Sequence, residues 1–433
     1  MPLRFVSFSG KMRMRRTDQT GERAHSLAGS YFWNTLGGIL NAGQSVLVLM
    51  VITRVLGLAA AGVYSIAFAT GNLFLYLGEY GVRNVQVSDL REQIPFRDYL
   101  AHRVLTVGLM LVLGACLCVF SFGRGTYSLE KSLTVFSMCL LKAVDCLEEV
   151  YEGRLHQRGR LDLAGKVMTV RLVVSIGGML AAAVLSRSLL LATDIAAALA
   201  AVSAFGMLFG YRREAAFIPG PVSGKNIGTL MRVCFPVCAA NFLQFYLINA
   251  PKYAIDAAME ETVQAQYNFI AMPVFVIQLL GMFLYQPVLG RMSAAAANGD
   301  RRALLSDIRR IVLGILGISG VCLAGAYVLG IPVLSVLYAT DLSAFRPELL
   351  WILVGGLFLA LSGFFCAVLT ILRCQSRILL IYAAGAALSF LLTGRMVRSS
   401  GILGAVLSFV WIMALVAALL ALFLAFSLRK SGE

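Results

Sequence analysis

The chain has 433 residues, of which 59% are hydrophobic and only 14% are charged, and its formal net charge is +15. This composition excludes an ordinary water-soluble globular protein, because about 25% of the residues of such a protein are charged. The positive charge does not indicate nucleic-acid binding, because most Lys and Arg residues lie in short gaps between apolar segments, where they would meet anionic lipid headgroups. We therefore expect membrane lipids, and no nucleic acid, among its partners.

Twelve apolar segments predict an all-α integral membrane protein with twelve transmembrane helices. A helix needs roughly 20 predominantly apolar residues to span a bilayer. In chain order the segments centre on residues 30–53, 61–80, 103–122, 129–150, 165–185, 189–210, 230–250, 266–285, 311–330, 349–371, 378–396 and 402–427.

The basic residues between these segments predict the orientation in the membrane. Alternate gaps, which we assign to the cell interior, hold 27 Lys and Arg residues, whereas the other gaps hold 8. Short loops rich in Lys and Arg stay in the cytoplasm. We therefore expect a multi-pass protein of the cytoplasmic (inner) membrane with both termini in the cytoplasm. Residues 1–26 show no cleavage pattern of a signal peptide and are expected to form a basic cytoplasmic tail.

A polar stretch rich in Pro and Gly, Arg212–Ile227, falls near the middle of the chain and has six segments on each side. It predicts two six-helix lobes joined by a cytoplasmic linker. The expected parts are the tail 1–26, the amino-terminal lobe 27–211, the linker 212–227, the carboxy-terminal lobe 228–428 and a second cytoplasmic tail 429–433.

The two halves share an ordered set of features, which predicts an internal repeat. Each half has an Asn-x-x-Gln motif in its first segment, then a basic residue, then a Tyr that opens the second segment, then a basic inner connection. The pairs are Asn41-x-x-Gln44 and Asn241-x-x-Gln244, Arg54 and Lys252, Tyr64 and Tyr267, and Arg83–Arg103 and Arg291–Arg310. Because each half crosses the membrane an even number of times, an axis along the membrane normal can relate them, with the substrate site at their interface.

The paired amides have two open interpretations. Asn41, Gln44, Asn241 and Gln244 belong to polar stripes that we expect to face a cavity between the lobes. The alternative is that each amide forms a hydrogen bond with a neighbouring helix, which contributes roughly 0.6 kcal/mol.

The fourth segment carries charges at mid-membrane depth. Lys142, Asp145 and Glu149 lie within about 60° of one another on a helix, and Arg171 of the fifth segment is placed to meet Asp145. A charge at this depth costs on the order of 3 kcal/mol and usually marks function. One interpretation is a structural Asp145–Arg171 ion pair. The other is that Lys142 and Arg171 attract an anionic substrate while Asp145 or Glu149 titrates. Glu149 and its neighbour Glu148 also fit simple boundary residues at the interface.

The remaining reactive residues predict no chemistry. All nine cysteines lie in or at the ends of apolar segments, and Cys234 and Cys238 have no His nearby, so we expect packing rather than a disulfide or a metal site. Asp256, Glu260 and Glu261 form an outer acidic cluster that we assign to a solvated turn. No cofactor is expected.

Three passages resemble the Wzx-type oligosaccharide flippase family, a branch of the superfamily that also contains the multidrug and toxic-compound extruders. They are Ile52-Thr-Arg-Val-Leu-Gly with Ala61-Gly-Val-Tyr-Ser, Asn249-Ala-Pro-Lys-Tyr-Ala-Ile-Asp256 with Ala265-Gln-Tyr-Asn268, and Phe283-Leu-Tyr-Gln-Pro-Val-Leu-Gly290. The resemblance implies a transporter, not an enzyme. It would flip an undecaprenyl-diphosphate oligosaccharide from the inner to the outer leaflet by alternating access, for cell-surface polysaccharide biosynthesis. Positive residues would hold the diphosphate.

These inferences together predict a site and its partners. The predicted substrate-binding residues are Lys142 and Arg171 in the amino-terminal lobe, Arg54 and Lys252 at the outer mouth, and Asn41, Gln44, Asn241 and Gln244 between the lobes; Asp145 and Glu149 are ion-coupling or ion-pair residues. The partners are the lipid-linked oligosaccharide, H⁺ or Na⁺ if transport is coupled, and a glycan polymerase or export machinery. Asp145 and Glu149 keep open the alternative of a cation-coupled multidrug antiporter, whereas the short outer loops disfavour a glycosyltransferase or polymerase.

The predicted orientation can be tested with cysteines introduced into a variant that lacks the nine native ones. Cysteines at Glu260 or Ser343 should react with an impermeant maleimide added outside the cell. Cysteines at Arg158 or Gly224 should react only after the membrane is permeabilised. The reverse labelling pattern would contradict the predicted orientation.

Overall fold

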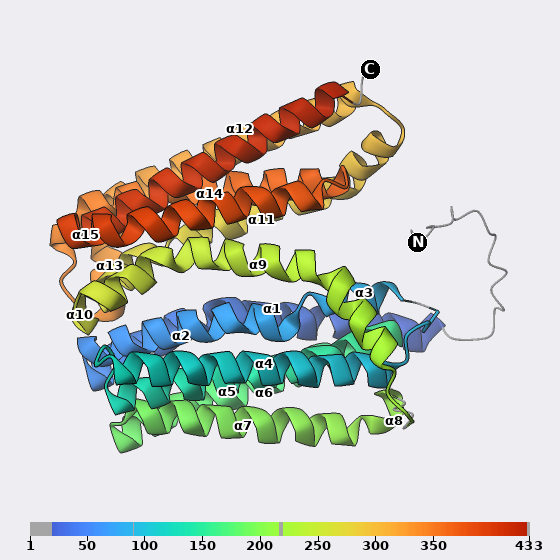
Figure 1. Cartoon of the computed structure of the whole chain (residues 1–433), viewed down its shortest axis with the longest axis horizontal. Coiled ribbons are helices and arrows are strands. Elements are labelled where there is room, and N and C mark those ends of the chain that lie inside the picture. The colour runs from blue at the N-terminus through green and yellow to red at the C-terminus, as the bar shows by residue number, and fades with distance from the viewer. Residues whose placement is uncertain (1–19, 90, 216–219, 431–433) are drawn as a thin grey trace.

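The computed structural model describes residues 20–89, 91–215 and 220–430 (Figure 1). Over these residues the secondary structure is helical, without strands. Most of the predicted tail 1–26, part of the linker 212–227 and residues 431–433 of the second tail lie outside the described residues.

The helices follow the predicted segments in order. In the first half they are α1 (Thr20–Leu56), α2 (Leu58–Glu79), α3 (Val82–Ser88), α4 (Phe96–Gly123), α5 (Leu129–Gln157), α6 (Leu161–Ser186), α7 (Leu189–Gly210) and α8 (Arg212–Ala215). In the second half they are α9 (Gly224–Ala258), α10 (Glu261–Ala271), α11 (Val274–Ala297), α12 (Arg301–Gly325), α13 (Ile331–Tyr338), α14 (Arg346–Ile371) and α15 (Gln375–Lys430). A π-helical turn (Ala326–Gly330) joins α12 to α13, and a 3₁₀ turn (Ser343–Phe345) precedes α14.

Ten helical stretches of the described chain are long and apolar enough to cross a membrane. Two features reconcile this number with the twelve predicted segments. The long α15 covers two segments, because Gly401 breaks it with a non-helical backbone (φ 58°, ψ −133°) that glycine adopts without strain. The helix α5 is not among the ten, although it coincides with a predicted segment, because many of its residues are charged.

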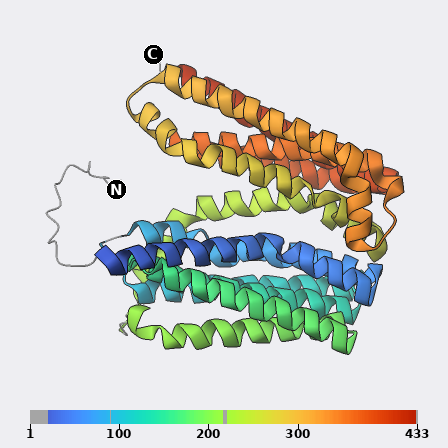
Figure 2. The ribbon, with the colours of Figure 1, turned by 180° about the vertical axis from the view of Figure 1, so that it is seen from behind.

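Two views of the ribbon show the helices in two groups (Figures 1 and 2). The first group contains α1, α2 and α4–α7, the second contains α11, α12, α14 and α15, and α9 runs between them. The first turns of α9 pack on the first group, where Leu230 and Cys234 share a core with Tyr99 and Val150. Beyond Pro236, α9 packs against α15 and also contacts α2 through Cys238, Phe245 and Tyr253. Because proline removes a backbone hydrogen bond and bends a helix, α9 can belong to both groups.

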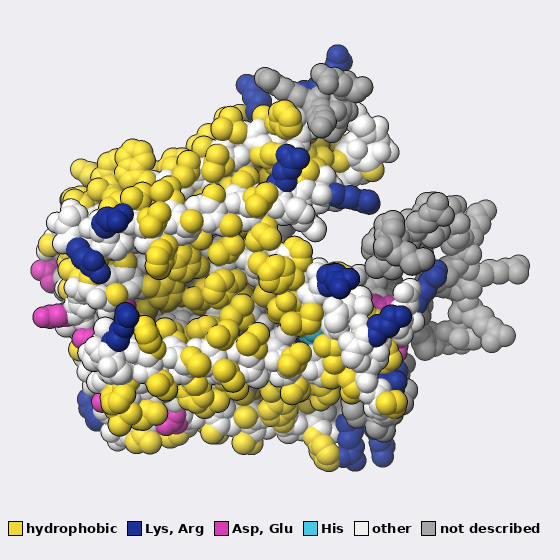
Figure 3. All heavy atoms as spheres, viewed as in Figure 1, with side chains coloured by type: hydrophobic (Ala, Val, Ile, Leu, Met, Phe, Trp, Pro, Cys, Tyr) yellow, Lys and Arg dark blue, Asp and Glu magenta, His cyan; other side chains and the backbone are white. Residues whose placement is uncertain are grey.

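The groups meet at one end of the molecule and separate at the other. We call the end where α1 begins and α15 ends the terminal end, and the opposite one the far end (Figure 1). At the far end α10 lies against α2 and α13 against α1. A Cβ atom on Gly62 would lie 1.8 Å from the carbonyl oxygen of Glu261, so only glycine allows this approach. At the terminal end the space-filling view shows a notch between the groups (Figure 3).

The surface has the distribution of a membrane protein. Hydrophobic side chains cover the middle of the face in Figure 3, and charged side chains lie toward the two ends of the helices. Large apolar side chains such as Leu185 and Phe390 are more than three-quarters exposed. The hydrocarbon core of a bilayer would cover this band.

Candidate functional site

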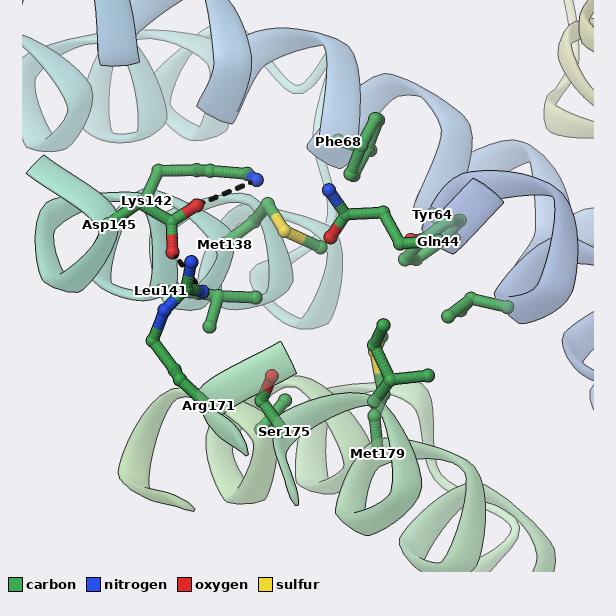
Figure 4. A pocket seen from close by; sticks show the side chains of 13 residues that line it. Gln44, Tyr64, Phe68, Met138, Leu141, Lys142, Asp145, Arg171, Ser175 and Met179 are labelled. Atoms are coloured by element: carbon green, nitrogen blue, oxygen red, sulfur yellow. Dashed lines mark hydrogen bonds and ion pairs between the residues drawn. The ribbon is translucent and has the colours of Figure 1, made fainter. Parts of the chain in front are cut away.

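A small cavity lies inside the first group, between α1, α2, α5, α6 and α7. Its lining includes Gln44, Tyr64, Lys142, Asp145 and Arg171 (Figure 4). The space open to the centre of a water molecule is about 10 Å³, which is roughly the room that one water needs. In this conformation the cavity cannot hold a sugar or a drug-sized molecule.

The charged side chains at this cavity neutralise one another. The Nζ atom of Lys142 lies 2.9 Å from one carboxylate oxygen of Asp145, and an Arg171 guanidinium nitrogen lies 2.5 Å from the other (Figure 4). Arg171 also pairs with Glu148. The side chains of Lys142 and Arg171 are only 3% and 7% exposed, so these pairs are largely shielded from solvent and are not easily exchanged for other partners.

This group of charges continues along α5 as a ladder. The carboxylates of Asp145, Glu148, Glu149 and Glu152 recur at helical spacing and therefore lie on one face. Beyond Arg171 of α6, the partners come from two further helices. Arg103 of α4 lies 2.7 Å from Glu149, and Arg83 of α3 lies 2.9 Å from Glu152. The ladder thus connects α5 to three neighbouring helices.

The assignment of Glu148 and Glu149 as simple boundary residues is wrong. The Glu148 side chain is 1% exposed, and Glu149 pairs with the completely buried Arg103, which also donates a 2.8 Å hydrogen bond to the Gly78 carbonyl. The reason is that α5 continues to Gln157 inside the protein, so its carboxylates lie well before its end. Arg103 was assigned to an inner gap, but it lies in the third turn of α4.

A second cavity lies inside the second group, between α9, α10, α11, α14 and α15. Its lining includes Asn249, Lys252, Tyr267, Gln278 and Phe409, and its water-accessible space is about 20 Å³. No acidic side chain lines it, and no described residue forms an ion pair with Lys252. Whereas the first cavity contains paired charges, the second contains a single cation without a counter-ion.

The two cavities are lined by residues that the repeat matches. Tyr64 lines the first and Tyr267 lines the second. Val48 lines the first cavity and Ile248 lines the second, and each lies four residues after the Gln of its Asn-x-x-Gln motif. The repeated sequence features therefore coincide with corresponding positions in the two groups.

The other predicted substrate residues do not come together in one cavity. The Gln44 amide donates a 2.8 Å hydrogen bond to the side chain of the exposed Asn41. Asn241 and Gln244 are half-buried and line neither cavity. A common cavity for the four amides stays a prediction. Arg54 is exposed at the far end and donates hydrogen bonds to the carbonyls of Val336 (2.8 Å) and Leu337 (3.2 Å), near the end of α13.

The assignment of the outer acidic cluster to a solvated turn is wrong for Asp256, which joins the two groups, whereas Glu260 is exposed. The Asp256 side chain is 8% exposed, lies 2.8 Å from Lys131 of α5 and accepts a 2.6 Å hydrogen bond from the Tyr127 hydroxyl. Lys131 also lies 3.2 Å from Glu261. We call Tyr127, Lys131, Asp256 and Glu261 the far-end clamp. Asp256 and Glu261 are predicted on the outer side from the sequence, but their contacts with Tyr127 and Lys131 are not.

The cysteines contribute to packing. All nine are free thiols. Cys234 and Cys238 are buried where α9 packs against the first group, in the same core as Tyr99 and Val150.

Comparison with known proteins identifies the fold. No family model and no curated protein matches the sequence. Among solved structures, the lipid II flippase MurJ in an inward closed conformation has a TM-score of 0.69 at 10% identity, covering 94% of this chain and 90% of MurJ. An inward-facing multidrug resistance MATE family transporter has a TM-score of 0.66 at 12% identity (90% and 95% covered). An outward-facing one has a TM-score of 0.52 at 13% identity (94% and 96% covered).

The fold is that of the MOP superfamily transporters. Identities this low show the fold alone, so the resemblance to oligosaccharide flippases is supported at the level of the fold only. The similar structures are transporters and a flippase rather than enzymes, and they support a multi-pass membrane protein.

A double-mutant cycle tests the ion pairs at the first cavity. Asp145→Leu should lower the free energy of unfolding by about 3–5 kcal/mol, because it leaves the buried Lys142 without its partner. Lys142→Leu should lower it less, because Arg171 still pairs with Asp145. The double variant should be closer to the native protein, since Arg171 keeps Glu148. Unfolding is measured thermally in detergent.

The control for this cycle is Arg158→Leu. Arg158 lies 3.9 Å from Glu92, and both side chains are more than a third exposed, so its loss should lower the unfolding free energy by less than about 1 kcal/mol. Additive effects of Lys142→Leu and Asp145→Leu would contradict the proposed coupling.

Proposed function

We propose that this protein flips an oligosaccharide linked to undecaprenyl diphosphate from the inner to the outer leaflet of the cytoplasmic membrane, for cell-surface polysaccharide biosynthesis. Its partners are the lipid-linked oligosaccharide and membrane lipids, with a glycan polymerase or export machinery as the next step. Transport needs no cofactor.

The observation that carries this proposal is the pairing of the acids on which a cation antiporter would rely. Asp145 is bound by Lys142 and Arg171, and Glu149 is bound by the buried Arg103. An antiporter for cationic substrates needs a carboxylate that is free to exchange partners. The second cavity instead presents Lys252 without a counter-ion. The ligand that this charge distribution favours is an anion.

The arrangement of the helices supports alternating access between two six-helix lobes. The groups touch at the far end and separate at the terminal end (Figures 1 and 3). With the terminal end in the cytoplasm, as the basic gaps predict, this is an inward-facing state. The TM-score is also higher against the inward-facing MATE transporter than against the outward-facing one, 0.66 against 0.52.

The membrane potential favours outward movement of such a substrate. One charge that crosses 100 mV changes the free energy by about 2.3 kcal/mol, so two negative charges leaving an inside-negative cell are favoured by roughly 4–5 kcal/mol. Coupling to H⁺ or Na⁺ is therefore permitted but not required.

A cation-coupled multidrug antiporter is the second candidate, and one observation favours it. Glu79, the last residue of α2, is close enough to Glu149 and Arg103 to interact electrostatically. It forms no direct ion pair or hydrogen bond with a described side chain. An acid in this position is available to bind a proton or a cation.

Purified protein in proteoliposomes distinguishes the two functions. A fluorescent undecaprenyl-diphosphate glycan in the inner leaflet should become accessible to an added quencher or glycosidase at a rate at least tenfold above protein-free vesicles, and ethidium should not be exported along a H⁺ or Na⁺ gradient. Glu79→Gln should leave flipping intact. Gradient-driven ethidium export that Glu79→Gln abolishes, without flipping, would establish the antiporter instead.

The far-end clamp generates a separate prediction about conformation. Lys131→Ala leaves the buried Asp256 without its cation, which should weaken the closed far end by about 3 kcal/mol and shift the equilibrium about a hundredfold toward far-end opening. The distance between spin labels at Gly125 and Ser343, measured by pulsed electron paramagnetic resonance, should be longer in Lys131→Ala than in the native protein. Arg124→Ala is the control, because Arg124 contacts Phe120 of its own helix. An unchanged distance in Lys131→Ala would show that the clamp does not hold this end closed.

A further inference from the structure

The second cavity contains three polar side chains whose hydrogen-bonding capacity is unused. Lys252 is on α9, Tyr267 on α10 and Gln278 on α11, and all three line the cavity. Within the described chain, none of them forms a side-chain hydrogen bond or an ion pair. Tyr267 is only 2% exposed, and Lys252 and Gln278 are half-buried. Burying polar groups without partners is costly, so groups from three helices that converge on one cavity indicate a ligand that would satisfy them.

The second cavity differs in charge from the first because the equivalent helices of the two groups carry different residues. Lys142 lies 13 residues after the start of α5, and Leu359 lies 13 residues after the start of α14, the equivalent crossing of the second group. Leu359 lines the second cavity. The second cavity therefore lacks the Lys–Asp pair of the first and carries its cation on α9, where no lining acid neutralises it.

The rest of the lining suits a saccharide. Phe275 and Phe409 accompany Tyr267 around the cavity, and aromatic faces pack against the C–H faces of pyranose rings. Asn249 adds a second amide beside Gln278. Apolar walls with a few converging polar groups are the usual composition of a ligand site.

The helices that line this cavity are irregular beside it. Pro251 lies inside α9 next to Lys252, and the turn at Met272 and Pro273 separates α10 from α11 between lining residues. Broken helices in transporters concentrate at substrate sites, because they can rearrange without losing a full ladder of hydrogen bonds. The present space of about 20 Å³ corresponds to a closed site.

We propose that this cavity is the subsite for the anionic linkage and first sugar of the substrate, with Lys252 binding the phosphate and Gln278 and Tyr267 binding sugar hydroxyls. The proposal rests on the flippase function proposed above and assigns the anion to the second group. Lys142 and Arg171, which are predicted from the sequence to bind the substrate, then instead hold α5 in position against α6 through Asp145.

Equilibrium binding to protein in nanodiscs tests the assignment with three radiolabelled probes. They are farnesyl diphosphate, farnesyl diphosphate bearing one N-acetylglucosamine, and farnesyl N-acetylglucosamine without phosphate. Lys252→Gln should weaken binding of both diphosphates at least tenfold and leave the neutral probe unchanged, and Lys252→Arg should restore most of the affinity. Gln278→Leu should weaken only the sugar-bearing probes. The exposed Lys225→Gln is the matched control and should bind all three as the native protein does.

A measurement on the native protein covers the case in which Lys252→Gln does not fold. Acetic anhydride should acetylate Lys252, and the sugar-bearing diphosphate should protect it several-fold while Lys225 is unaffected, as read by mass spectrometry. Native affinity in Lys252→Gln, or no protection of Lys252, would overturn the subsite while flipping still supports the function. Failure of the native protein to bind either diphosphate or to flip the glycan would overturn the function itself.

Discussion

The paired charges on α5 are the constraint on which the first half of this molecule depends. A carboxylate or guanidinium inside a bilayer-spanning bundle has no water to solvate it, so each must meet an opposite charge in a defined position. Asp145, Glu148, Glu149 and Glu152 meet cations from α3, α4 and α6 as well as Lys142 of α5. These contacts fix the rotation and depth of α5 relative to its neighbours, which apolar packing alone would leave less defined.

Among its described residues, the second half has no such ladder. Where α5 carries Lys142, α14 carries Leu359, and Lys252 instead extends from α9 into a cavity without acids. Two groups that share sequence features thus differ in their buried charges. Ion pairs connect the helices of the first group, whereas Lys252 in the second has no ion-pair partner among the described residues.

The sequence was sufficient for the helices and insufficient for their contacts. Length and hydropathy predicted the long apolar helices and their order, because a bilayer demands such helices, and ten helical stretches of the described chain are long and apolar enough to cross a membrane. The spacing of Lys142, Asp145 and Arg171 predicted their association. The partner of Glu149 was missed because Arg103, at the edge of an apolar segment, has the appearance of a loop residue. The acidic spacing along α5 was the available signal. Asn241 and Lys252 lie on nearly the same helical face but are eleven residues, or roughly 16 Å, apart along α9, so periodicity alone could not place them in one cavity.

Pro236, inside α9, is a position at which this helix can bend. The first turns of the helix are fixed in the core of the first group. The arm of 22 residues beyond Pro236 packs against α15, while Cys238, Tyr253 and Asp256 of this arm also contact the first group. This arm is roughly 33 Å long, and a change of about 20° at Pro236, a typical size for a proline kink, would displace its tip by roughly 11 Å. Lys252 is near that tip, and so is Asp256 of the far-end clamp. One rotation at a single proline would therefore break the far-end clamp and move Lys252 at the same time. Opening of the far end and movement of the cation would then be coupled through one helix.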